Sequence, residues 1–115
     1  MTRRARLARL HQLAAMKRDH DLARLSRLSE ARAQTAEKLQ KLAQPVPLAE
    51  DPALFAARQA HLAWAMAQRR QLNLTLAQQT ARMLNQRAHA ARSFGRAEAL
   101  AQLLRHDAQR DTHSP

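Results

Sequence analysis

Six histidines and nine carboxylates are the side chains of this sequence that could bind a metal ion or transfer protons. The histidines stand at positions 11, 20, 61, 89, 106 and 113, and no two have the spacing of three or four residues that places two ligands on one helix face. The closest carboxylates are Asp19 with Asp21, which point apart on a helix, and Glu50 with Asp51, which suit a capping role in a turn. The sequence has no cysteine, no glycine-rich phosphate loop and no nucleophile with an evident base. We therefore expect no enzyme, no metal site and no cofactor.

Binding through positive charge is the remaining chemistry that the composition favours. The formal net charge is +11, and arginine greatly outnumbers lysine. Between Pro52 and Ala97 there is no Asp or Glu, yet seven arginines fall there: Arg58, Arg69, Arg70, Arg82, Arg87, Arg92 and Arg96. Surface helices usually alternate charges to form ion pairs one turn apart. The uncompensated charge indicates either an anionic partner, most simply an acidic protein surface, or a solvated face that keeps the chain soluble.

Nucleic acid is the competing anionic partner. Its phosphates bind arginine well. However, the arginines are spread along the chain instead of forming one basic block, aromatic residues for stacking on bases are almost absent, and no helix-turn-helix or zinc-finger spacing is present. We expect non-specific binding of nucleic acid at most.

The elements that position these side chains are predicted to be two long helices in one domain. Ala, Leu, Arg and Gln dominate, while β-branched and aromatic residues are scarce, so the fold class is all-α. Three of the four prolines fall at 45, 47 and 52, and Asp51 followed by Pro52 is typical of a helix N-terminus. We predict helix 1 at about 3–43, a proline-rich turn at 44–51, helix 2 at about 52–105, and a frayed tail at 106–115.

Heptad spacing predicts that the two helices pack as an antiparallel coiled-coil hairpin. Helix 1 carries Leu25, Leu28, Arg32, Thr35, Leu39 and Leu42 at alternating intervals of three and four. Helix 2 carries one seven-residue ladder of Phe55, Leu62, Arg69, Leu76, Met83, Ala90, Ala97 and Leu104, and a second of Ala65, Leu72, Gln79, Gln86, Ser93 and Leu100. Trp64 and Met66 are expected to pack on helix 2, whereas an exposed Trp64 would indicate a second contact site. Because two helices alone bury little surface, the hairpin is expected to depend on a partner or on self-association.

A turn centred near Val46–Leu48 would place Leu42 opposite Ala53, Leu28 opposite Ala67 and Leu7 opposite Ala88. The N-terminal start of helix 1 would then lie opposite Arg92 of helix 2. The part of helix 2 after Arg92 would extend roughly 15–20 Å beyond helix 1, at about 1.5 Å per residue. The alternatives are that helix 1 frays, or that a different register folds this segment back at Gly95. The uncovered segment would be a docking site. Its apolar residues are Phe94, Leu100, Leu103 and Leu104.

The N-terminal run "RLARLHQLAAMKRDHDLARLSRL" (6–28) and the two-helix layout resemble the FliJ family of the flagellar type III export apparatus. The resemblance implies a coiled-coil stalk that enters the export ATPase ring, contacts the export gate protein at the membrane and handles export chaperones. It further implies that the paired chain ends dock in the ring. The same four apolar residues would then meet a hydrophobic bearing, and acidic loops would meet Arg3, Arg4, Arg6, Arg92 and Arg96.

Other functional classes remain open beside this one. They are a basic coiled-coil protein associated with nucleic acid, and a structural or self-assembling coiled-coil adaptor. No stretch of 18 apolar residues occurs, so no transmembrane segment is predicted. A cytoplasmic location is expected, with the resemblance adding peripheral contact at the inner face of the cell membrane.

Overall fold

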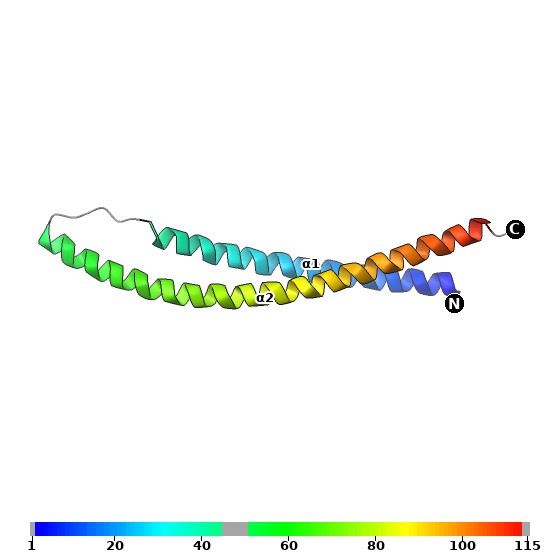
Figure 1. The fold of residues 1–115 in the computed structure, drawn as a ribbon, viewed down its shortest axis with the longest axis horizontal. Coiled ribbons are helices and arrows are strands. Elements are labelled where there is room, and N and C mark those ends of the chain that lie inside the picture. The colour runs from blue at the N-terminus through cyan, green and yellow to red at the C-terminus, as the bar shows by residue number, and fades with distance from the viewer. Residues whose placement is uncertain (1, 45–50, 114–115) are drawn as a thin grey trace. The chain divides into compact units, whose positions relative to one another are not determined.

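Two α-helices, α1 (Arg3–Leu42) and α2 (Pro52–His113), account for nearly all of the computed structural model, which describes residues 2–44 and 51–113 (Figure 1). The all-α class and the longer second helix are therefore confirmed. The helix boundaries at Leu42 and Pro52 agree with the prediction to within one residue. Residues 45–50 of the predicted turn, like residues 1, 114 and 115, lie outside the described residues.

Side-chain caps fix where both helices begin. The Thr2 hydroxyl accepts a hydrogen bond from the Ala5 amide at 3.1 Å, and the Asp51 carboxylate accepts one from the Ala53 amide at 3.0 Å. Each cap satisfies one of the amides that the first helical turn leaves without a partner. Proline at the first position of α2 removes another such amide. The predicted start of helix 2 at Asp51–Pro52 is thus confirmed.

The helices form two compact units. One unit, here called the terminal unit, contains residues 1–27 and 83–115, and the other, the central unit, contains residues 28–82. In each unit a segment of α1 lies antiparallel beside a segment of α2 (Figure 1). The predicted antiparallel hairpin is therefore confirmed.

The contact seam follows strict heptads on both helices. On α1 the less exposed positions include a series spaced alternately by four and three: Leu7, His11, Ala14, Arg18, Asp21, Leu25, Leu28, Arg32, Thr35, Leu39 and Leu42. On α2 the corresponding series is Ala65, Leu72, Leu76, Gln79, Met83, Gln86, Ala90, Ser93, Ala97, Leu100, Leu104 and Asp107. The first predicted ladder of helix 2 is thus confirmed from Leu76 onward and the second from Ala65 onward. Their three other members, Phe55, Leu62 and Arg69, are exposed.

The predicted register is wrong. In the terminal unit Asp21 contacts Ser93, and Arg4 reaches Asp107 and Asp111. The prediction instead placed Leu7, close to Arg4, opposite Ala88. In the central unit the Arg32 guanidinium donates to the Thr80 hydroxyl at 2.8 Å. Each contact joins α1 to a part of α2 well beyond the predicted partner.

The register explains why the predicted overhang at the C-terminal end of α2 does not exist. Leu100 and Leu104 are half-buried in the seam of the terminal unit, beside the N-terminal part of α1. The part of α2 without α1 beside it is its beginning, in the central unit (Figure 1). Residues 52–64 are exposed there except for a half-buried Arg58. Trp64 and Met66, which were expected to pack, are 52% and 56% exposed.

The predicted end of helix 2 near Arg105 is also wrong, because α2 continues to His113. The prediction stopped at the last apolar residue, Leu104. Polar contacts carry the helix farther: Arg4 on α1 forms ion pairs with Asp107 and Asp111 at 3.9 and 3.1 Å, and the Thr112 hydroxyl donates to the Gln109 carbonyl at 2.8 Å. The described part of the predicted frayed tail is therefore helical.

Candidate functional site

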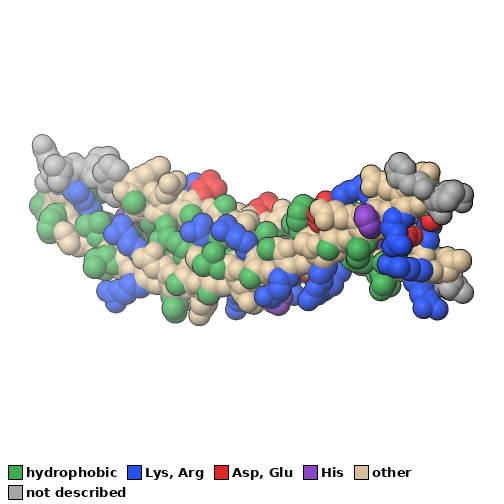
Figure 2. Space-filling view, turned by 45° about the vertical axis from the view of Figure 1, so that its right-hand side comes forward, with side chains coloured by type: hydrophobic (Ala, Val, Ile, Leu, Met, Phe, Trp, Pro, Cys, Tyr) green, Lys and Arg blue, Asp and Glu red, His purple; other side chains and the backbone are tan. Residues whose placement is uncertain are grey.

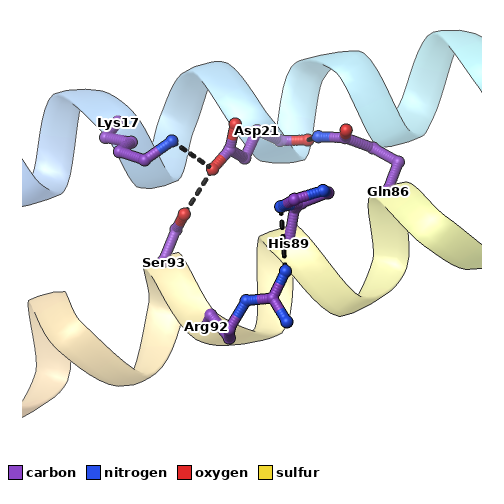
Figure 3. Close-up of polar contacts among 6 residues, drawn as sticks. All are labelled: Lys17, Asp21, Gln86, His89, Arg92 and Ser93. Atoms are coloured by element: carbon purple, nitrogen blue, oxygen red, sulfur yellow. Dashed lines mark hydrogen bonds and ion pairs between the residues drawn. The ribbon is translucent and has the colours of Figure 1, made fainter.

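A buried polar cluster holds the two helices together in the terminal unit (Figure 3). The Ser93 hydroxyl donates a hydrogen bond to the Asp21 carboxylate, and the Lys17 ammonium lies 3.3 Å from the same oxygen. The Gln86 amide donates to the Asp21 backbone carbonyl at 3.0 Å. Because polar seam residues need matching partners, this cluster specifies one register among those that the apolar ladder alone would allow.

The same cluster keeps Asp21 ionised. The Ser93 hydrogen bond lowers the pKa of the Asp21 carboxyl below its ordinary value of 3.8, with further help from Lys17 and against the opposing effect of burial. A carboxylate in a helix seam is therefore compatible with the fold at neutral pH. Next to the cluster, Arg92 bonds the His89 ring at 3.0 Å on the exposed side of α2 (Figure 3).

Toward the chain ends from this cluster, α1 and α2 form an apolar groove, here called the terminal groove. It has a volume of about 470 Å³. Its lining is Leu10, Leu13, Ala14, Lys17, Arg96, Ala99, Leu100 and Leu103. Leu10, Leu13 and Leu103 are each about half exposed, at 52%, 54% and 48%. Three leucines side by side on two helices form an apolar surface whose exposure to water is unfavourable in free energy. Such a surface is typical of a protein contact site.

Basic side chains surround the terminal groove. Arg96 stands on its rim, together with Lys17, which pairs with Asp21. Arg6 and Arg9 line an adjoining hollow that shares Leu10 and Leu13. The acidic residues of α2 in this unit are already engaged by arginine: Glu98 with Arg105, and Asp107 and Asp111 with Arg4. The rim of the groove is therefore positively charged.

The structure brings together only part of the predicted docking set. Leu100, Leu103 and Arg96 line the terminal groove, and Arg6 lines the adjoining hollow. Leu104 is half-buried in the seam, while Phe94 is exposed outside the groove lining. Among the arginines, Arg4 is engaged by α2 carboxylates, Arg92 bonds His89, and Arg3 is exposed.

Leu10, Leu13 and Ala99 are groove residues that the prediction missed. The signal was available, since Leu10 and Leu13 belong to "LARLHQL" (7–13) but do not fall on the heptad ladder of α1. Apolar residues off the ladder of a coiled coil face away from the seam, where they remain accessible to a partner.

Comparisons with protein-family models, with curated proteins and with solved structures find no match for this chain. Neither described helix is long and apolar enough to cross a lipid bilayer. In residues 2–44 and 51–113, no three His, Asp or Glu side chains gather in a way that could hold a metal ion.

Proposed function

We propose that this protein is a non-enzymatic component of the bacterial flagellar type III export apparatus, a coiled-coil stalk that docks on the export ATPase ring and the export gate. The observation that carries the proposal is the terminal groove, which combines an apolar lining with a basic rim. The resemblance of residues 6–28 to the FliJ family supplies the identity of the partners. Handling of export chaperones, a cytoplasmic location and contact with the membrane face belong to the same proposal.

The groove suits a partner with an apolar loop or helix bordered by acidic residues. Leu10, Leu13 and Leu103 offer the apolar contact, and burial of each exposed leucine would stabilise a complex by about 1 kcal/mol or more. Arg6, Arg9 and Arg96 would steer an acidic surface toward the groove and fix its orientation. Nucleic acid offers charge but little aliphatic surface, so this lining favours a protein partner.

Substitution of groove leucines tests the proposal. We expect Leu13→Gln combined with Leu103→Gln to weaken binding to the purified export ATPase about tenfold or more, and to remove any stimulation of ATP hydrolysis. The matched control changes two equally exposed leucines outside the groove, Leu74→Gln with Leu84→Gln. Circular dichroism should show that both double variants remain helical.

Equal loss of binding in both double variants would contradict docking through the terminal groove. Binding to duplex DNA without any affinity for the ATPase would favour the nucleic-acid-associated alternative. Deletion of the chain after Arg92 is a poor test, because it removes Ser93 and Ala97 and so leaves the first half of α1 without its partner in the seam.

A further inference from the structure

A second groove, separate from the terminal groove, lies in the central unit where α1 ends beside α2. Here called the central groove, it has a volume of about 700 Å³. Both helices contribute aliphatic side chains to it, among them Leu42 from α1 and Leu62 and Leu72 from α2. Leu62 and Trp64 are 39% and 52% exposed. Figure 2 shows hydrophobic side chains on the surface near the start of α2, with Lys and Arg side chains among them.

The exposed side chain of Trp64 is the clearest indication that the central groove binds a partner. It is the only tryptophan of the chain, and its ring lies 5.6 Å from that of His61, which also lines the groove. Large aromatic rings contribute strongly to binding, because they bury much area and lose few rotamers. The sequence indicates a second contact site if Trp64 is exposed, and the structure shows that Trp64 is exposed.

The walls of the central groove are basic on both sides. Lys38 and Lys41 stand on the α1 side and Arg69 on the α2 side. Glu37 pairs with Lys41 at 3.5 Å, with both side chains exposed. On the α2 side the sequence supplies no carboxylate between Asp51 and Glu98. A ligand in this groove would therefore meet an excess of positive charge over an apolar floor.

We propose that the central groove binds an acidic amphipathic helix of a partner protein. The C-terminal end of α1 and the exposed start of α2 together offer an apolar floor for a third helix, which would pack with its apolar stripe inward and its charges toward the basic walls. Charge complementarity decides the sign of the partner, since glutamate and aspartate at the edges of that helix would face Lys38, Lys41 and Arg69.

The same features argue against the other occupants. A second copy of this chain would bring a further net charge of +11 to a basic groove. A flat membrane would contact one face of α2, but Trp64 and Met66, both exposed, are two residues apart and so lie on nearly opposite sides of the helix, about 160° apart. Nucleic acid would leave the aliphatic floor of Leu42, Leu62 and Leu72 without an apolar partner.

Fluorescence of Trp64 provides a direct assay, since no other tryptophan contributes. The probe is a blocked peptide of about three heptads with leucine at the two apolar positions and glutamate at the flanking ones. We expect a saturable blue shift of the Trp64 emission when the peptide is added to the protein, and an affinity for the peptide that falls as salt is raised. A scrambled peptide of the same composition should produce no saturable shift.

Charge reversal tests the walls of the groove. Lys38→Glu with Lys41→Glu should weaken peptide binding about tenfold or more. The matched control, Arg24→Glu with Arg27→Glu, makes the same change of net charge at exposed positions of α1 outside both grooves and should weaken it less than about threefold. Leu62→Gln should weaken binding while leaving its salt dependence unchanged.

Several results would overturn the proposal. They are an equal response to the scrambled peptide, an equal loss in the two charge-reversed variants, or a Trp64 response only to duplex DNA or to vesicles of phosphatidylglycerol. Leu13→Gln with Leu103→Gln, which alters the terminal groove, should leave the Trp64 response intact. Failure of the export-apparatus proposal is therefore distinguishable from failure of this one.

Discussion

Replacement of Gly95 by alanine should raise the free energy of unfolding by about 1 kcal/mol, the difference in helix propensity between the two residues. Gly95 lies inside α2, and its φ is not positive, so alanine can adopt the same backbone. A Cβ added there would meet no atom within 4 Å beyond its helix neighbours. The change therefore adds helix stability without a clash, and the melting temperature should rise by about 4 °C.

The opposite change two residues away is the matched comparison. Ala97 is 1% exposed in the seam. Ala97→Gly should cost about 1 kcal/mol of propensity and about 0.8 kcal/mol for the buried methyl group, so close to 2 kcal/mol in all. Urea unfolding followed by circular dichroism measures both variants, and the slope with urea should not change.

The free energies of unfolding of the two variants should thus differ by about 3 kcal/mol, although each variant only exchanges glycine and alanine. A loss of stability in Gly95→Ala would refute a continuous helix at this position and would indicate a bend there. A cost of only about 1 kcal/mol in Ala97→Gly would show that its methyl group is not buried, and would refute the register of the terminal unit.

Two further predictions concern Asp21. Its pKa lies below 3.8 in the folded chain, so ionised Asp21 stabilises the fold above that ordinary value, and the contribution is lost as the pH falls through the lower folded pKa. Asp21→Asn should flatten this acid dependence in urea titrations, and an equally steep dependence would contradict it. The chain has no cysteine, so introduced pairs can be tested one at a time. Asp21→Cys with Ser93→Cys should form an intrachain disulfide on mild oxidation, detected by gel mobility. Asp21→Cys with Leu74→Cys, the pair that the predicted register brings together, should not form one.

Much of the fold follows from local features of the sequence. Helix propensity, the Asp51–Pro52 start signal and the heptad ladders are set by neighbouring residues. The structure has the two helices and the start signal where they were predicted, and it has the ladders except at Phe55, Leu62 and Arg69. The exposure of Leu10 and Leu13 could also be read from their positions off the ladder. Of the four apolar residues predicted to dock, Leu100 and Leu103 line the terminal groove, and docking through them stays a prediction.

The register could not be obtained in the same way. Among the described residues, the buried apolar residues of the seam are the alanines Ala65, Ala90 and Ala97, which pack almost equally well against several partners. Shifting one helix by whole heptads keeps such a seam apolar, so the ladder leaves the pairing open. The prediction assumed that pairing begins at once after the turn, and so moved the uncovered part of α2 to the wrong end.

The sequence by itself determined two long helices, their seam faces and a basic surface, because these depend on residues within a few turns of one another. Only the tertiary structure decided which parts of the helices meet. That choice depends on distant polar pairs, Asp21 with Ser93 and Arg32 with Thr80, whose hydrogen bonds exist in one register and are lost in its neighbours. The same choice leaves Trp64 exposed and creates both grooves.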